Sequence, residues 1–368
     1  MKVPFFNYPW VYLQHEEEIH EKILEIMHRG AFILQEDLEE FEKNLCKYLN
    51  VNHAFGVADG TNALILGLMA MGIGKDDEVI VPSHTYIASA ASIHFAGAIP
   101  IPVECGDDHM LDPDVIVSAI TSQTKAIMPV QLNGRTCNMR KIMDIADQYD
   151  LKIIEDAAQA LGSKFKNQYA ATFGGIGTFS FYPAKLLGTF GDGGAVITND
   201  DELGKKISHL RDHGRNDLGE VVAWGTNSRL DNMHAAVLDI KLKYFQEDID
   251  KRRNIARQYQ ESLGSISQIS LPPGPDTNSN HFDVYQNYEI LTHNRDSFQS
   301  YLRDNGVGTL VQFGGKAIHQ HLELGFNNIS LPKTEEMYKS LIMLPMNTSL
   351  SEDDVGYVID TIIKFHKT

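Results

Sequence analysis

The chain has little cysteine, with only three residues of this type among 368. Cys46, Cys105 and Cys137 are scattered, without the spacing of a metal site or of paired disulfide cysteines. Their scarcity excludes a disulfide-rich secreted domain, and we expect a reduced protein of the cytoplasm. We interpret the cysteines themselves as small buried apolar groups.

Positive charge and long apolar runs are also scarce. The chain carries 49 acidic and 32 basic residues, which gives a formal net charge of −17. Such a chain repels nucleic acids and anionic membranes, so we expect neither as a partner, and a phosphorylated ligand needs a local cluster to hold it. No apolar run approaches the roughly 18 residues of a membrane span, and the first residues lack the apolar core of a signal peptide. With 43% hydrophobic residues, the sequence predicts a soluble protein with at least one large core.

The sequence does contain short β-branched runs that alternate with helical stretches up to about residue 200. These runs are 78–81, 99–103, 126–130 and 152–154. Apolar runs buried on both faces, with helices between them, are typical of a mainly parallel α/β sheet. Helical periodicity over residues 15–50 predicts a lead-in before this sheet.

The last part of the chain predicts a second, smaller domain. A long charged helix near 240–262 leads out of the sheet region, and the stretch 272–275 reads Pro-Pro-Gly-Pro, a turn-rich hinge. A capping box that starts at Ser351 predicts the last helix. We therefore expect a lead-in and large α/β domain over 1–250, and a smaller α+β domain over 251–368.

Lys185 is the residue that points most clearly to a reaction. It stands among apolar neighbours, and Gly188, Gly191, Gly193 and Gly194 follow it. A lysine is solvent-exposed by default, but these surroundings disfavour exposure, and glycines at this density predict a cramped backbone. Desolvation lowers the pKa of an amine, so Lys185 can bond an aldehyde and then act as a base near neutral pH.

Asp156 is the second chemical signal, because it directly follows the run 152–154, and ligands of parallel sheets collect at strand ends. A carboxylate there can keep the ring nitrogen of a pyridine cofactor protonated, which makes the ring a sink for a carbanion. Without Lys185, a helix cap or an ion-paired aspartate would be the better interpretation. If a helix starts at Asp156, Gln159 lies on the same face and can reach the phenolic oxygen of the ring.

Two further positions would complete a site for pyridoxal 5'-phosphate. The stretch 60–62, Gly-Thr-Asn, opens a predicted helix whose N–H groups and dipole favour a phosphate, although an ordinary helix cap fits the same residues. Tyr86 follows the run 78–81 and can stack on the cofactor ring, or else be a core tyrosine. Taken together, the positions predict a Schiff-base enzyme.

These residues stand in motifs that resemble the DegT/DnrJ/EryC1/StrS family of nucleotide-sugar aminotransferases. The matching stretches run nearly from end to end: 60–64, 74–82, 155–159, 180–185, 191–195, 225–230 and 344–346. The resemblance implies the fold of aspartate aminotransferase, a PLP-dependent transferase. That fold is an α/β fold with a mainly parallel central sheet sandwiched by helices and a smaller C-terminal α+β domain.

The resemblance also implies a role for each cofactor residue. Lys185 bonds the cofactor aldehyde, Asp156 pairs with the ring nitrogen, and Gln159 meets the phenolic oxygen. Tyr86 lies on the ring face. Asn227 reaches the phosphate from the neighbouring subunit, which implies a homodimer whose active sites each need both chains. The implied phosphate loop and its partner are Gly60, Thr61, Asn62 and Ser180.

By the same resemblance, the enzyme takes an amino group from glutamate and passes it, through pyridoxamine 5'-phosphate, to a nucleotide-linked keto sugar. We expect a 4-keto-6-deoxyhexose rather than a 3-keto sugar, and a product destined for a surface polysaccharide such as the O-antigen of lipopolysaccharide, or for a glycoside. Relatives with histidine in place of Lys185 are dehydratases, so the lysine favours transamination. A PLP-dependent dehydratase or other lyase, and a regulatory protein that senses a sugar or amine, stay open as alternatives.

Two stretches depart from the family pattern where contact with the sugar is expected. Residues 131–135 read Gln-Leu-Asn-Gly-Arg, and residues 311–319 read Val-Gln-Phe-Gly-Gly-Lys-Ala-Ile-His. Lys316 and His319 are candidate ligands of a diphosphate, although a surface lysine and a structural histidine fit them equally. The other expected substrate contacts are Tyr182 and Arg229.

Overall fold

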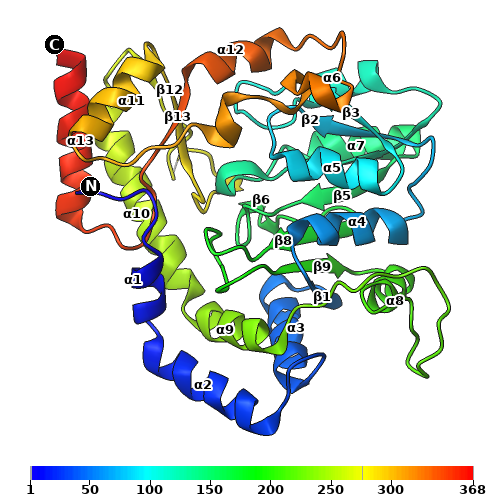
Figure 1. The fold of residues 1–368 in the computed structure, drawn as a ribbon. Coiled ribbons are helices and arrows are strands. Elements are labelled where there is room, and N and C mark those ends of the chain that lie inside the picture. The colour runs from blue at the N-terminus through cyan, green and yellow to red at the C-terminus, as the bar shows by residue number, and fades with distance from the viewer. Residues whose placement is uncertain (1, 276, 368) are drawn as a thin grey trace.

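The computed structural model describes residues 2–275 and 277–367, so the outermost residues of the two expected domains, 1 and 368, lie outside the description. A seven-stranded sheet forms the centre of the large domain (Figure 1). Its strands, in spatial order, are β1 (His53–Val57), β9 (Gly194–Thr198), β8 (Ile176–Ser180), β5 (Lys152–Asp156), β4 (Thr124–Ile127), β2 (Glu78–Pro82) and β3 (Ile99–Val103).

The predicted mainly parallel sheet is confirmed. Only β9 runs against its neighbours β1 and β8, while β8, β5, β4, β2 and β3 pair in parallel. The predicted run 126–130 is divided, because β4 ends at Ile127 and Val130 instead forms a separate bridge with Asp156. This bridge fixes the carboxyl end of β5, where Asp156 stands.

Helices flank the sheet and fill the connections between its strands. Helix α4 packs on strands β8 and β9 and on helix α5, while helix α3 packs on strand β1 and on helix α9. The helices of the large domain are α1 (Tyr8–Leu13), α2 (Glu16–Arg29), α3 (Glu36–Leu49), α4 (Gly60–Ala70), α5 (Ile87–Phe95), α6 (Pro113–Ala119), α7 (Met139–Tyr149), α8 (Asp201–Leu210) and α9 (Asn232–Lys243). A small antiparallel sheet joins β6 (Lys164–Phe165), β7 (Gln168–Tyr169) and β11 (His281–Phe282).

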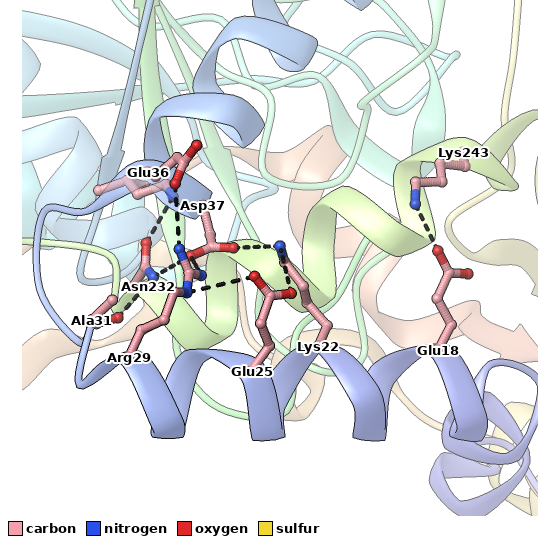
Figure 2. Close-up of polar contacts among 10 residues, drawn as sticks. Glu18, Lys22, Glu25, Arg29, Ala31, Glu36, Asp37, Asn232 and Lys243 are labelled. Atoms are coloured by element: carbon pink, nitrogen blue, oxygen red, sulfur yellow. Dashed lines mark hydrogen bonds and ion pairs between the residues drawn. The ribbon is translucent and has the colours of Figure 1, made fainter.

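The predicted helical lead-in consists of two helices, α2 and α3, and the buried carboxylate of Asp37 links both of them to α9. Figure 2 shows Asp37 at the start of α3 between α2 and α9. Its carboxylate is 2.7 Å from Lys22 Nζ and 2.6 Å from Arg29 Nη2, and Asn232 Nδ2 donates to it at 2.6 Å. Burial alone would raise the pKa of Asp37, but these partners lower it. Because Asp37 is buried and charged, loss of these partners would leave an uncompensated charge between the helices.

The smaller domain has its own apolar core and a three-stranded antiparallel sheet in the order β10-β12-β13. The predicted helix near 240–262 breaks at Tyr244 into α9 and α10, and α10 crosses the domain division expected at residue 250. Val3 also packs in the small-domain core, although the other residues of that core come from the last part of the chain. The last helix begins as predicted, since Ser351 Oγ accepts from the N–H of Asp354 at 3.1 Å. The elements are α10 (Phe245–Leu263), β10 (Ile269–Ser270), β12 (Tyr288–Thr292), α11 (Arg295–Asp304), α12 (Pro332–Ser340), β13 (Leu341–Leu344) and α13 (Glu352–Lys367).

Candidate active site

A cavity of about 760 Å³ opens at the carboxyl ends of the parallel strands, between the two domains. The residues predicted to hold the cofactor meet there although they come from distant parts of the chain. Those that line it are Gly60, Thr61, Asn62, Tyr86, Asp156, Gln159, Ser180 and Lys185, and Tyr182, which was predicted to contact substrate, lines it as well. The sequence did not point to Phe6, Tyr8, Gln286 and Asn287, which also line it. Gln312 and Phe313 line it too, and they belong to the stretch 311–319 that departs from the family pattern.

Lys185 is placed in this cavity by a turn that the small domain holds. Gln286 lies just before β12, and it accepts from the N–H of Leu186 at 2.6 Å and donates to the carbonyl of Ala184 at 2.7 Å. Both bonds flank Lys185, so its backbone is fixed from both sides. Burial lowers the pKa of the Lys185 amine, and the nearby charge of Asp156 opposes that change without cancelling it. An amine in this position is prepared to react as a nucleophile or base.

Asp156 ends β5 with its carboxylate buried at the cavity. Ser89 Oγ donates to Oδ2 at 2.7 Å, and the N–H of Ala158 donates to Oδ1 at 3.1 Å. These bonds fix the direction of the carboxylate. A charged carboxylate at this place can pair with a protonated ring nitrogen.

Gln159 reaches the cavity by a different route from the one predicted. The chain turns after Asp156 and forms no helix at 156–160, so the helical-face argument for Gln159 is corrected. Its Oε1 instead accepts from the N–H of Asn133 at 2.9 Å and from Asn287 Nδ2 at 3.2 Å. Gln159 still lines the cavity beyond Asp156.

The two stretches that depart from the family pattern meet at this point. Asn133 Oδ1 accepts from Gln312 Nε2 at 3.0 Å and from Asn287 Nδ2 at 2.9 Å. We call Asn133, Gln159, Asn287 and Gln312 the amide cluster. Within the described part of the chain, Gln312 Oε1 is buried and has no hydrogen-bond partner. This acceptor lies on a residue that lines the cavity, so a ligand with a hydroxyl or amine donor can satisfy it.

The predicted phosphate loop is the start of α4. Asp59 caps the helix, since its Oδ1 accepts from the N–H of Asn62 at 2.8 Å and its Oδ2 from Asn62 Nδ2 at 2.6 Å. The Asp59 carboxylate, which would repel a phosphate, therefore has both of its oxygens hydrogen-bonded within the first turn of α4. A Cβ on Gly60 would lie 2.8 Å from Ser180 Cβ, and one on Gly194 only 2.5 Å from the backbone of Asp59. Glycine is therefore required for this loop to approach the ends of β8 and β9.

Aromatic rings stand at the mouth of the cavity. Tyr86, directly before α5, is 59% exposed, and its ring centroid lies 5.9 Å from that of Phe313. Phe6 and Tyr8 form a stacked pair at 5.6 Å on the N-terminal segment, and both line the cavity. An exposed tyrosine beside a cavity fits a stacking role better than the core position that the sequence left open.

The expected substrate contacts fall into different places. Tyr182 lines the cavity and is half exposed, whereas Arg229 Nη1 is bound to Asp212 at 2.8 Å. Lys316 is exposed outside the cavity lining. For His319 the expectation is corrected, because its ring is 2% exposed and both ring nitrogens have protein partners. His319 Nδ1 lies 2.6 Å from Ser83 Oγ, and this hydrogen bond joins the loop to the large domain, so the ring does not face a ligand.

Asn227 stands outside the cavity of its own chain, on an exposed segment. It forms a bridge with Asp212, and the same segment exposes Leu218 by 83%, Val221 by 72% and Trp224 by 95%. Large apolar side chains exposed together on one segment are typical of an interaction surface.

The site fits pyridoxal 5'-phosphate in each of its parts. It offers a buried amine for the aldehyde, a carboxylate for the ring nitrogen, a crowded helix start for the phosphate and an aromatic ring at the entrance. Comparison with known proteins then decides the family: the model of the DegT/DnrJ/EryC1/StrS aminotransferase family matches residues 13–363. The chain belongs to this family. It is a PLP-dependent transaminase with the fold that the resemblance implied.

Three relatives show how far the likeness extends. A dTDP-3-amino-3,4,6-trideoxy-alpha-D-glucose transaminase of Streptomyces venezuelae is 37% identical, over 98% of this chain and 95% of its own length. A dTDP-3-amino-3,6-dideoxy-alpha-D-galactopyranose transaminase of Aneurinibacillus thermoaerophilus is 36% identical, over 99% of both chains. The crystal structure of Streptomyces venezuelae DesV, in complex with a ketimine intermediate, superposes with a TM-score of 0.95 at 36% identity, covering 100% of this chain and 99% of the other.

None of the helices in the described residues has the length and apolar character needed to cross a membrane.

Proposed function

We propose that this family member transfers an amino group from glutamate to a nucleotide-linked 3-keto-deoxysugar. The observation that carries the proposal is the meeting of Lys185, Asp156 and the start of α4 in one cavity. The sequence favoured a 4-keto sugar, but the two relatives named above are both transaminases of 3-amino sugars, which supports C3. Amination at C4 is the second candidate, because the family motifs themselves do not name a carbon.

Pyridoxal 5'-phosphate, when bound, supplies an aldehyde for the amine and a ring that withdraws electrons from the reacting carbon. Lys185 would hold the cofactor through this aldehyde, and its amine, once released, would accept a proton at one atom and return it at another. Its lowered pKa supports the role, because the neutral amine is the form that accepts a proton. Asp156 holds a proton on the ring nitrogen, and Ser89 keeps the carboxylate aimed.

The remaining cofactor contacts all come from the large domain. Gly60, Thr61, Asn62 and Ser180 hold the phosphate at the start of α4, where the helix dipole and backbone N–H groups favour an anion. Tyr86 covers the ring at the entrance. Gln159 approaches the phenolic oxygen from the turn after β5, and Asn133 and Asn287 determine its direction.

We assign to the sugar the surface formed by Phe313, Tyr182 and three residues of the amide cluster: Asn133, Asn287 and Gln312. Gln312 Oε1 accepts a hydrogen bond from a sugar hydroxyl in this proposal, because it is otherwise buried without a partner among the described residues. Arg229 and Lys316 lie outside the cavity of their own chain. They can meet substrate only where a second subunit closes over the entrance.

A homodimer completes the site in this account. Asn227 reaches the partner's cofactor phosphate, and the exposed Leu218, Val221 and Trp224 cover apolar surface on the partner. Mixed chains test this directly. Lys185→Ala chains and Asn227→Asp chains are each expected to be nearly inactive alone, while their mixture regains activity through hybrid dimers that hold one intact site. A mixture that stays inactive, with hybrid dimers present, would contradict the exchange of residues.

We also place the enzyme in the cytoplasm. The cysteines of the described chain are unpaired, which agrees with a reducing compartment.

The reaction is tested in two halves. Incubation with glutamate alone is expected to convert the absorption spectrum to that of the pyridoxamine form and to release 2-oxoglutarate. A panel of thymidine-, uridine- and guanosine-diphosphate 3-keto and 4-keto sugars, read by mass spectrometry, then identifies the acceptor. A dehydratase predicts loss of water from the sugar with no need for glutamate, and this result would overturn transamination.

A further inference from the structure

A buried cluster of two imidazoles and one carboxylate lies beside the active site and takes no part in the proposed reaction. His84 follows β2, His109 lies in the connection after β3, and Glu289 belongs to β12 of the small domain. One ligand atom from each residue lies within 4.8 Å of the other two. His84 and Glu289 are buried, and the side chain of His109 is 20% exposed.

The hydrogen bonds of this cluster leave Glu289 only half satisfied. His84 Nε2 lies 3.3 Å and His109 Nδ1 2.7 Å from the same carboxylate oxygen, Oε1. Within the described residues, the other oxygen, Oε2, is buried without a partner. A buried carboxylate oxygen without a partner is costly, so this atom requires an explanation. A cation between the three side chains would use both the carboxylate and the two nitrogens.

We propose that His84, His109 and Glu289 bind one divalent transition-metal ion, with Zn²⁺ as the preferred ion. Two histidines and one carboxylate are a common ligand set for Zn²⁺, with bonds of about 2.0–2.2 Å and a fourth position left to water. At such lengths a tetrahedral site needs ligand atoms roughly 3.4 Å apart. Small side-chain rotations would bring the observed nitrogen–oxygen distances of 3.3 and 2.7 Å, and the distance between the two nitrogens, which is within 4.8 Å, to this value.

The surroundings supply an outer shell and an entry path. Tyr338 OH lies 2.8 Å from His84 Nδ1, so it orients the ring and leaves Nε2 to the metal. His109 and Glu289 also line a second cavity, of about 560 Å³. Its charged lining residues are Asp107, Asp108, Arg135, Asp283 and Glu289, and Arg135 is already paired with Asp283 at 2.5 Å. The excess of acids favours entry of a cation.

Cys105 is near this cluster but does not compete as a ligand. Its sulfur is not among the ligand atoms that lie within 4.8 Å of one another, which belong to His84, His109 and Glu289. The site therefore has nitrogen and oxygen ligands, which also separates Zn²⁺ from Mg²⁺, because Mg²⁺ prefers oxygen ligands and keeps most of its water. Glu289 belongs to the small domain and both histidines belong to the large one, so the bound ion would join the two domains. One of its ligands, His84, is two residues before Tyr86 in the sequence.

The test is metal content of the PLP-loaded enzyme after equilibrium dialysis against Zn²⁺, and against Mg²⁺ as the control ion. We expect one Zn²⁺ per chain, no bound Mg²⁺ and a higher unfolding temperature with Zn²⁺. His109→Ala and Glu289→Gln each should lose the ion, and Tyr338→Phe should keep the stoichiometry with about 10- to 100-fold weaker binding. The matched control is His94→Ala, which removes an exposed imidazole from α5 and should bind Zn²⁺ as the unaltered enzyme does.

Cobalt substitution supplies a second readout that does not depend on stability. Co²⁺ in the site should give visible d–d bands typical of nitrogen and oxygen ligands in the unaltered enzyme and in His94→Ala, and none in His109→Ala. His109 is the partly exposed ligand, so His109→Ala decides the question if Glu289→Gln fails to fold. Absence of bound Zn²⁺ would overturn the proposal, and so would equal binding to His109→Ala and the unaltered enzyme.

Discussion

The two walls of the active-site cavity are built in different ways. The cofactor wall, formed by Gly60, Asp156, Ser180 and Lys185, stands on strand ends and on a helix start in the large domain. The opposite wall consists of Asn133, Asn287 and Gln312 of the amide cluster, together with Phe313, and these residues lie on turns and at the edge of the small domain. Two of its residues, Asn133 and Phe313, have positive φ values of 55° and 52°, which side-chain-bearing residues adopt rarely.

The two walls therefore differ in how firmly the fold holds them in place. The sheet fixes the cofactor wall through parallel strand pairs and close glycine contacts, so a change there moves the backbone. The amide cluster depends on side-chain hydrogen bonds between loops, and one acceptor of it remains for a ligand. Catalysis and sugar recognition should therefore respond separately to mutation.

Lys185→Ala should have the largest effect and should abolish both half-reactions. Loss of the nucleophile and proton carrier is expected to lower steady-state turnover by about 10⁴-fold or more. Turnover with glutamate and the accepted keto sugar measures the effect, and Lys75→Ala, which removes an exposed lysine, is the control. Lys185→Ala with turnover close to that of Lys75→Ala would remove the lysine from the mechanism.

Asp156→Asn should come next, because the amide cannot hold the ring nitrogen protonated. We expect both half-reactions to slow by about 10²- to 10³-fold, the usual cost of removing one fixed electrostatic group from an active site. Stopped-flow spectra with glutamate measure the first half-reaction, and Asp147→Asn on the outer surface of α7 is the control. An unchanged rate in the glutamate half-reaction would show that Asp156 does not act on the ring.

Lys241→Met tests the support behind the cofactor wall. Lys241 Nζ donates to the carbonyl of Gly188, and burial lowers the pKa of this lysine from 10.5 to about 8, although Asp248 opposes the change. Between these two pH values Lys241 keeps its proton in the unfolded chain but loses it in the folded protein. The free energy of unfolding therefore rises with pH in this range. The unfolding free energy of the original enzyme minus that of Lys241→Met should therefore increase by about 3 kcal/mol from pH 8 to pH 10.5.

Urea unfolding at several pH values measures this difference, and Lys47→Met, which removes an exposed lysine, is the control. A difference that does not vary with pH would mean that Lys241 keeps an ordinary pKa in the folded protein.

Gln312→Leu should have the smallest effect, and one confined to the sugar. Removal of the unpartnered acceptor should raise the KM for the keto sugar by about 10-fold, since a hydrogen bond of this kind contributes on the order of 1–3 kcal/mol. The glutamate half-reaction should keep its rate, because the cofactor wall is intact. Gln168→Leu on β7 is the control outside the cavity. If Gln312→Leu impaired the glutamate half-reaction as much as the sugar half-reaction, the two walls would not act separately.

The cofactor wall could be predicted because strand ends leave a pattern in sequence. The runs 78–81 and 152–154 place Tyr86 and Asp156 at one edge of a parallel sheet, and the resemblance adds the roles. Gln159 shows the limit of local reasoning. A helical spacing was assumed, but the chain turns, and only the folded contact with Asn133 explains where the side chain points.

The opposite wall could not be predicted, because contacts between distant segments create it. Gln286 brackets Lys185 from about 100 residues away, and no local pattern reveals that pair of bonds. His319 was expected at the substrate from its place in the loop, yet its ring is buried against Ser83. The sequence did mark 131–135 and 311–319 as departures, and the structure joins them at Asn133 and Gln312.

Borohydride reduction of the yellow enzyme, followed by peptide mapping, tests the central claim most directly. Reduction fixes the cofactor to the amine that holds it, so we expect one labelled peptide, with the label on Lys185. Glutamate added before the reduction should remove most of this label by releasing the lysine. A label on any other lysine, or a label on Lys185 that glutamate never removes, would contradict the account.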